Sequence, residues 1–290
     1  MLQRILFALG LMCLLLTGGC AVKPTETLPT ELDQGWSAFL EQGISDLHRG
    51  NYEQALRIMD VAINKKPENY RLYYNRGICY SRLEEQLQAI EDFDKAIELN
   101  PDFVQAYNNR AWAYYHLGDS QRAVQDMRQA LEKAGSSARI HYNLGVVHAR
   151  GGQYIKAQEH YSRAIEKQPS MAEAYNNRGV VRTFLKEYEL AISDLSRALA
   201  LDPQNSSYYY NKAIALEESG SHEVAISRYT QALQQDPGFA PAYNNRGFLR
   251  FKLGYKEIGC QDLKRACEKG LCELYRQLKQ SGECGGEMGR

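Results

Sequence analysis

The chain has 290 residues, with 35 lysines and arginines against 35 aspartates and glutamates, so its formal net charge is zero. No basic stripe appears along it, which argues against nucleic-acid binding. The six histidines are scattered, and the sequence has neither a glycine-rich phosphate loop nor a serine-nucleophile motif. We therefore expect a protein that is not an enzyme and that uses no cofactor and no metal.

Residues 1–19 have the pattern of a secretory signal peptide. Arg4 supplies a positive start, and the apolar run Ile5–Leu16 is too short for a bilayer, which takes about 20 residues. The segment ends in a small residue directly before Cys20, which resembles a bacterial lipobox. This resemblance implies removal of residues 1–19 and lipid attachment at Cys20, and Ala21 favours the outer membrane, facing the periplasm. Cleavage without lipidation, giving a soluble periplasmic product, is the alternative.

Residues 20–35 combine Pro24, Pro29 and three threonines with few apolar side chains. Such a composition predicts a flexible tether rather than a folded element. A lipid on Cys20 would then hold the rest of the chain close to the membrane.

A five-residue motif built on asparagine recurs every 34 residues. A short period that recurs this often is typical of stacked structural repeats, whose joint surface binds a partner, and not of an enzyme with one pocket. The six copies are Tyr73-Tyr74-Asn75-Arg76-Gly77, Tyr107-Asn108-Asn109-Arg110-Ala111, His141-Tyr142-Asn143-Leu144-Gly145, Tyr175-Asn176-Asn177-Arg178-Gly179, Tyr209-Tyr210-Asn211-Lys212-Ala213 and Tyr243-Asn244-Asn245-Arg246-Gly247.

A second pattern follows in five of these periods: two alanines seven residues apart with a larger apolar residue between them. Spacings of 3, 4 and 7 place side chains on one face of a helix, so the pattern predicts a helix with a closely packed face. A proline, or once a glycine, then closes the period. Each repeat is therefore predicted to be helix, turn, helix. The larger residues are Phe93, Met127, Tyr161, Leu195 and Tyr229.

Together these patterns resemble the tetratricopeptide repeat (TPR), over more than four fifths of the chain. The resemblance implies an all-α fold, a right-handed superhelical solenoid of about seven TPR helix-turn-helix units with a C-terminal capping helix. The last repeat departs from the pattern at Gly259 and Cys267, where alanines are usual, as terminal repeats often do. The repeats are residues 36–69, 70–103, 104–137, 138–171, 172–205, 206–239 and 240–273, and a cap and tail follow at 274–290.

In four repeats an arginine stands where the TPR pattern usually has leucine, and an aspartate follows it at the same distance along the chain each time. The repeats that lack this arginine also lack the aspartate. We therefore expect an ion pair that joins the two helices of each such repeat, with a structural role. The pairs are Arg76 with Asp92, Arg110 with Asp126, Arg178 with Asp194 and Arg246 with Asp262.

The TPR resemblance also implies that the first helix of each repeat lines a concave groove, which the motif asparagine faces. Because an amide both donates and accepts hydrogen bonds, a row of asparagines is expected to bind an extended peptide. Local bonding alone is the alternative. The preceding residue alternates between tyrosine and asparagine, so the groove repeats itself only after every second unit. The predicted groove residues are Asn75, Asn109, Asn143, Asn177, Asn211 and Asn245, with Tyr74, Tyr142 and Tyr210.

Charge is spread unevenly over the predicted groove positions. A ligand that is acidic at one end and basic at the other would suit this pattern, and solvated charges without a partner are the alternative. Arginines occupy the earlier repeats and glutamates the later ones: Arg71, Arg82, Arg139 and Arg150, then Glu173, Glu217 and Glu218.

Four cysteines lie close together near the C-terminus: Cys260, Cys267, Cys272 and Cys284. In an exported protein this predicts two disulfides, with zinc as the competing interpretation. Cys260 and Cys267 on one helix would be about 10.5 Å apart, and a disulfide tolerates roughly 7 Å between Cα atoms. Cys260 should therefore pair with Cys272 or Cys284, which would fasten a final helix near residues 272–281. Cys79 is expected in the core.

These features predict a non-enzymatic scaffold or adaptor, anchored at the cell envelope by its N-terminal lipid. It would bind a protein or an extended peptide, of unknown identity, in the concave groove. A periplasmic carrier or chaperone, or a pilotin-like assembly factor for a secretion or pilus complex, is the alternative.

Overall fold

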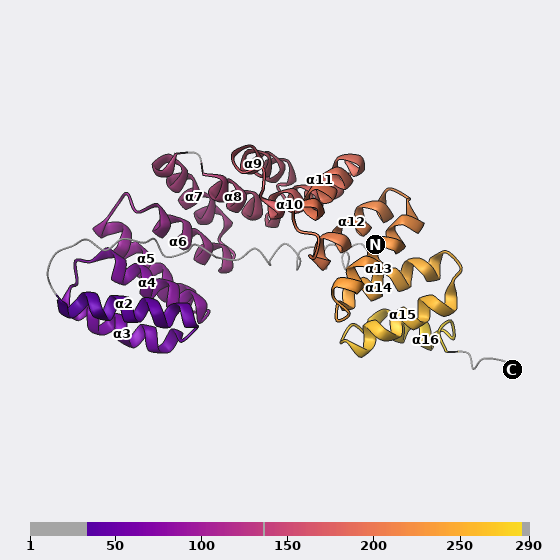
Figure 1. Ribbon diagram of the computed structural model, residues 1–290, viewed down its shortest axis with the longest axis horizontal. Helices are drawn as coiled ribbons and strands as arrows, with labels where there is room; N and C mark the ends of the chain where they lie inside the picture. Colours follow the sequence, from indigo (N-terminus) through magenta and orange to yellow (C-terminus); the bar gives the residue numbers. More distant parts are fainter. Residues whose placement is uncertain (1–33, 136, 286–290) are drawn as a thin grey trace. The chain divides into compact units, whose positions relative to one another are not determined.

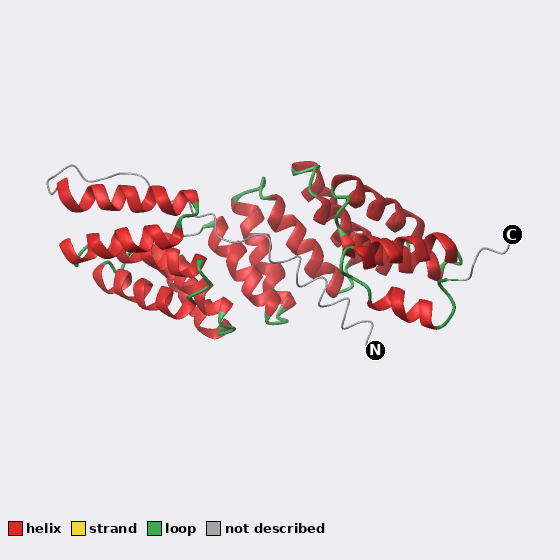
Figure 2. Ribbon diagram, turned by 90° about the horizontal axis from the view of Figure 1, so that it is seen from below, coloured by secondary structure: helices red, strands yellow, loops and turns green. Residues whose placement is uncertain are grey.

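The computed structural model describes residues 34–135 and 137–285 (Figure 1). The signal peptide, Cys20 and the tether lie outside this range. Within it every regular element is a helix (Figure 2), which confirms the all-α prediction. The helices are α2 (Gln34–Arg49), α3 (Tyr52–Lys65), α4 (Tyr70–Arg82), α5 (Gln86–Leu99), α6 (Val104–His116), α7 (Ser120–Ala134), α8 (Ala138–Arg150), α9 (Tyr154–Lys167), α10 (Ala172–Phe184), α11 (Tyr188–Leu201), α12 (Ser206–Glu218), α13 (His222–Gln235), α14 (Ala240–Lys252), α15 (Lys256–Glu268) and α16 (Glu273–Gln280).

Within each of two compact bodies, consecutive helices pack as antiparallel pairs, and the second helix of one repeat packs on the first helix of the next. Thus α4 packs on α5, α5 on α6 and α6 on α7, and the same order holds from α9 to α15. The chain divides after Gly151 into two compact bodies, which are described separately below. The first holds α2–α8 and the second α9–α16, so the boundary falls inside the predicted repeat 138–171.

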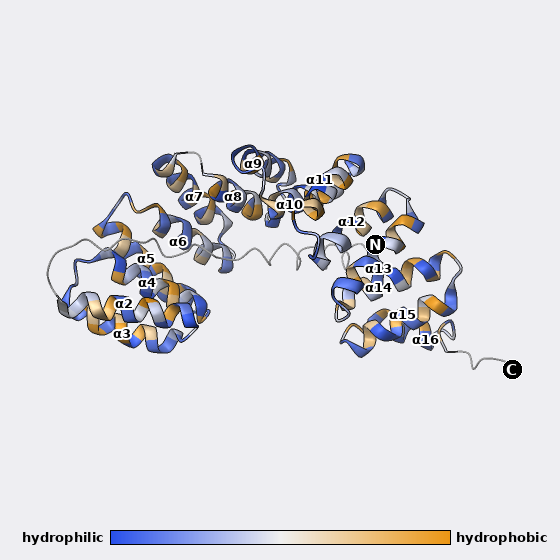
Figure 3. Ribbon diagram, viewed as in Figure 1, coloured by the Kyte–Doolittle hydropathy of each residue, from blue (hydrophilic) through white to orange (hydrophobic). Residues whose placement is uncertain are grey.

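The predicted alanine stripe forms the packed face of the second helices. Ala89, Ala96 and the larger residue between them, Phe93, are fully buried, and the same holds for the other stripes. Small residues opposite the stripe let the helices approach closely, since a Cβ added to Gly77 would lie 2.8 Å from the Phe93 ring. In Figure 3, polar and apolar residues alternate along each helix, as expected for amphipathic helices.

The turn between the paired helices contains one residue in the left-handed region in every repeat. Five repeats place glycine there, which adopts this conformation without steric cost. The other two use Glu84 and Lys186, with φ of 64° and 63°. The glycines are Gly50, Gly118, Gly152, Gly220 and Gly254.

The C-terminal cap consists of α16, which packs on α15. Disulfides join Cys260 to Cys284 and Cys267 to Cys272, so of the two partners left open for Cys260 the structure has Cys284. Gly259 replaces the usual alanine because a Cβ there would lie 2.7 Å from the Gly247 carbonyl oxygen.

None of the helices from α2 to α16 is both long and apolar enough to cross a membrane. Cys79 is a free, buried thiol, and burial raises its pKa to about 12, which fits a core residue.

Candidate functional site

The predicted arginines and aspartates are brought together in all four repeats. Arg76 donates from Nε to Asp92 Oδ2 at 2.9 Å and from Nη2 to Asp92 Oδ1 at 2.7 Å. The same two-bond pairing joins Arg110 to Asp126, Arg178 to Asp194 and Arg246 to Asp262. These aspartates are only 2–5% exposed. Each pairing joins the two helices of one repeat, and we call it an arginine clamp.

Each clamp arginine also bonds to the preceding repeat, which the sequence interpretation did not include. Its Nη1 donates to a residue on the second helix of that repeat: Asp60, Asp94, Ser162 and Thr230 for Arg76, Arg110, Arg178 and Arg246. The arginine therefore joins three helices. The signal was in the sequence, because an acidic or hydroxyl residue precedes each clamp arginine by the same distance along the chain that separates the arginine from its aspartate.

The predicted groove rows are covered by their neighbours, which corrects the expectation that they face a ligand. All nine side chains (Asn75, Asn109, Asn143, Asn177, Asn211, Asn245, Tyr74, Tyr142 and Tyr210) are between 1 and 9% exposed. Hydrogen bonds between neighbouring first helices accompany this burial. In four junctions the asparagine of one repeat donates to the alternating residue of the repeat before it, so the rows hold successive repeats together.

The alternation of tyrosine and asparagine has a structural cause. Where the alternating residue is tyrosine, the next asparagine donates to its hydroxyl: Asn109 to Tyr74 at 3.1 Å and Asn245 to Tyr210 at 3.0 Å. Where it is asparagine, the next asparagine donates to its amide oxygen: Asn143 to Asn108 at 2.8 Å and Asn211 to Asn176 at 2.9 Å. The two-repeat period of the sequence therefore reflects two kinds of junction between repeats.

An open cleft of about 600 Å³ lies at the C-terminal ends of α4 and α6, in the first body. We call it the α4–α6 cleft. Of the predicted groove residues, Asn109 and Arg82 line it. The complete lining is Ile78, Ser81, Arg82, Glu84, Gln86, Phe93, Asn109, Trp112, His116 and Leu117.

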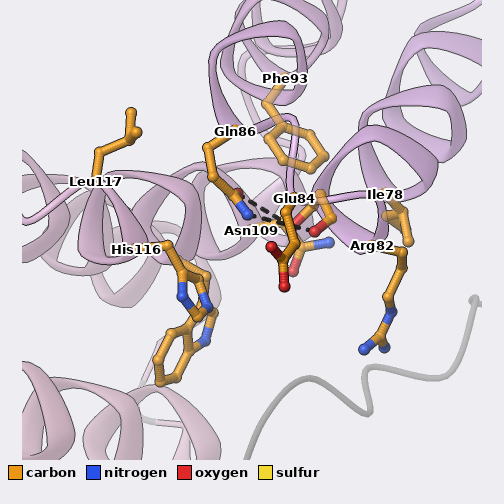
Figure 4. A pocket seen from close by; sticks show the side chains of 10 residues that line it. Ile78, Arg82, Glu84, Gln86, Phe93, Asn109, His116 and Leu117 are labelled. Carbon is orange, nitrogen blue, oxygen red and sulfur yellow. Dashed lines mark hydrogen bonds between the residues drawn. The ribbon is translucent and has the colours of Figure 1, made fainter.

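Figure 4 shows Glu84 and Gln86 near the middle of the cleft, with His116 and Leu117 on one side and Ile78 and Arg82 on the other. Gln86 donates to the Ser81 carbonyl oxygen at 3.3 Å, which ties the turn to the end of α4.

An aromatic cluster supports the α6 side of the cleft. The Trp112 ring lies 5.0 Å from the Tyr115 ring and 6.2 Å from His116. The Arg150 guanidinium of α8 lies 4.5 Å from the Tyr115 ring centre, in a cation–π contact. Partial burial of its ring, followed by the charge of Arg150, lowers the pKa of His116. The cleft thus combines apolar walls with one arginine and one glutamate, Arg82 and Glu84.

The second body holds a partly buried carboxylate at one of the predicted groove positions. Glu217 accepts a hydrogen bond of 2.7 Å from the Tyr229 hydroxyl. Burial raises the pKa of Glu217 to about 7, opposed in part by this bond. Asn245 donates to the same hydroxyl at 3.5 Å, so the carboxylate ends a network that reaches the junction with the next repeat. No set of three metal-ligating side chains occurs among residues 34–135 and 137–285.

Models of the tetratricopeptide repeat match residues 70–103, 138–171 and 172–205, and two further models of the same repeat match 93–125 and 206–239. Together they cover more than half of the chain. No curated protein matches the sequence.

Solved structures share the fold at low sequence identity. A tetratricopeptide repeat protein from Parabacteroides merdae is 19% identical, with a TM-score of 0.68 over 86% of this chain and 98% of its own. PilW, described as a widely conserved type IV pilus biogenesis factor, is 18% identical, with a TM-score of 0.66 over 72% of this chain and 96% of its own. YrrB, described as having an unusual peptide-binding site, is 23% identical, with a TM-score of 0.52 over 63% and 95%.

Proposed function

Because the chain belongs to the tetratricopeptide repeat family, whose members typically act as protein-interaction scaffolds, we propose that it is a non-enzymatic adaptor that holds a protein partner at the cell envelope. The partner inserts a segment into the α4–α6 cleft. The proposal rests chiefly on one observation: the side chains of the asparagine rows are buried, and four of the six asparagines bond to the preceding repeat, whereas this cleft is open and lined by both apolar and charged side chains.

The lining of the cleft indicates the chemistry of the bound segment. Its volume of about 600 Å³ is in the range of sites that enclose a ligand, roughly 300–1,000 Å³. Ile78, Trp112 and Leu117 offer apolar contact, and Arg82 offers a charge-assisted hydrogen bond to a carboxylate. A segment with an apolar or aromatic anchor beside an acidic residue fits these walls.

Two features support the envelope location. The first is the pattern of residues 1–20, with its lipobox-like end at Cys20. The second is the pair of disulfides in the C-terminal cap, since disulfides persist mainly in exported proteins. Fractionation of a Cys20→Ala variant tests the anchor, and unchanged membrane retention would count against lipidation.

Site-specific photo-crosslinking in intact cells tests the binding role. A crosslinker at His116, which is exposed at the cleft, should capture one partner in good yield. A matched crosslinker at Val61, an exposed residue of α3 away from the cleft lining, should not. Equal capture from both positions would refute binding in the cleft, and capture of many unfolded proteins from His116 would favour a carrier instead of an adaptor.

A further inference from the structure

The repeat 206–239 carries two cations at the positions where four other repeats carry an arginine clamp. Lys212 on α12 stands at the arginine position, and Arg228 on α13 stands at the aspartate position. The third clamp position, on the second helix of the preceding repeat, is Ser196 of α11, which adds no negative charge. The carboxylate that neutralises the other clamps is therefore missing here.

Among residues 34–135 and 137–285, no carboxylate from elsewhere takes its place, since none of the ion pairs found there includes Lys212 or Arg228. The Arg228 guanidinium donates from Nη1 to Gln231 at 2.6 Å, but its Nε is buried and has no hydrogen-bond partner in this part of the chain. A buried donor without a partner is unfavourable, especially on a charged group, so an acceptor placed beside Arg228 Nε would stabilise this site.

The two cations also act on each other. Both side chains are only partly exposed. Burial, followed by the charge of Arg228, lowers the pKa of Lys212. Two like charges that are screened incompletely by solvent repel, and an anion between them would relieve the repulsion.

We propose that Lys212 and Arg228 form a binding site for a single oxyanion, which takes the place of the clamp aspartate. The ligand is a carboxylate of a partner side chain or a free inorganic anion such as phosphate, since both present oxygens that a guanidinium and an ammonium group bind. Partial exposure of both residues gives a ligand access from solvent. The site lies in the second body and is independent of the α4–α6 cleft.

Thermal unfolding of the purified protein in increasing inorganic phosphate, at constant ionic strength set with chloride, tests the site. The melting temperature should rise with the logarithm of the phosphate concentration once this exceeds the dissociation constant, because a ligand that binds only the folded state stabilises it. Arg228→Asp should melt higher than the native protein without phosphate, since it restores an ion pair with Lys212, and it should lose the phosphate response. Arg197→Asp, at an exposed arginine of α11, should keep the response.

Arg228→Gln keeps the test decisive if Arg228→Asp folds poorly. It removes the repulsion and one anion contact, so its apparent phosphate affinity should fall by about tenfold or more. An unchanged phosphate response in Arg228→Gln would overturn the proposal, as would an equal loss in Arg197→Asp. A short glutamate-containing peptide titrated in parallel separates the two sources: tighter binding than phosphate indicates a partner carboxylate, and weaker binding indicates a free anion.

Discussion

Arg178 and Asp194 lie on the paired helices α10 and α11 and are joined by two hydrogen bonds of 2.8 and 2.7 Å. Asp194 accepts a third bond, of 2.8 Å, from Nη1 of Arg182. The carboxylate is 4% exposed, so it is desolvated and fully dependent on these donors. This relationship explains why the arginine and the aspartate of a repeat occur together or not at all.

Removal of one clamp partner should be costly. Arg178→Leu leaves the buried charge of Asp194 with Arg182 as its only remaining arginine, and we expect it to lower the free energy of unfolding by about 3 kcal/mol. The double variant Arg178→Leu/Asp194→Leu should lose much less free energy of unfolding than the sum of the two single variants. Urea unfolding should give a coupling energy of about 1–3 kcal/mol between the two positions. Additive losses would show that the two side chains do not interact.

An asparagine that bonds to the neighbouring repeat should contribute more to stability than one that bonds only within its own helix. Asn211→Ala removes a bond to Asn176 in the neighbouring repeat and leaves a buried amide oxygen unpaired, so we expect a loss of about 1–3 kcal/mol. Asn75 is equally buried, but its amide donates only to the Arg71 carbonyl oxygen within its own helix. Asn75→Ala is therefore the matched control, and in urea unfolding it should lose less free energy of unfolding than Asn211→Ala. The reverse order would contradict a junction role for Asn211.

The left-handed position of the turn should favour glycine. Lys186 adopts φ of 63° there, and Lys186→Gly should raise the unfolding free energy by up to about 1 kcal/mol through relief of strain. Gly220 lies at the equivalent turn position with φ of 87° and gives the opposite test. Gly220→Ala should lower the unfolding free energy by about 1–2 kcal/mol. A lower melting temperature for Lys186→Gly would mean that the lysine side chain outweighs the backbone strain.

Glu217 should make stability depend on pH between about 4.5 and 7. Its folded pKa of about 7 lies above the ordinary value of 4.5, so the folded state holds the proton more tightly than the unfolded state. The stabilisation is complete below pH 4.5 and is lost as the pH rises through 7, by up to roughly 3 kcal/mol. Glu217→Gln keeps an acceptor for Tyr229 and should flatten this part of the profile. An unchanged profile in urea unfolding would show that Glu217 titrates normally.

Features that depend on spacing along one helix pair could be predicted from the sequence. The period of the helix converts the spacing of Ala89, Phe93 and Ala96 into a packed face, and it places Arg76 opposite Asp92. The family's fold then follows from repetition of this unit.

Features that depend on how successive repeats approach each other could not be predicted. Burial of the asparagine rows is set by the distance between neighbouring first helices, which lets Asn109 reach the Tyr74 hydroxyl. The α4–α6 cleft joins Ile78 and Trp112 from different repeats, and no motif marks such a space. The choice of Cys284 over Cys272 depends on the turn after α16, which helix geometry does not determine.

Binding of a partner in the α4–α6 cleft is tested most directly by the partner's affinity for two variants of matched chemistry. Leu117→Asp changes a residue of the cleft that is 48% exposed, and Leu87→Asp changes a residue of α5 that is 65% exposed and not in the lining. Both should keep the native melting temperature, since neither side chain is buried. We measure binding of the partner identified by crosslinking. Leu117→Asp should raise its dissociation constant by about tenfold or more, and Leu87→Asp should leave it unchanged. An equal effect of the two variants, or none from Leu117→Asp, would contradict binding in this cleft.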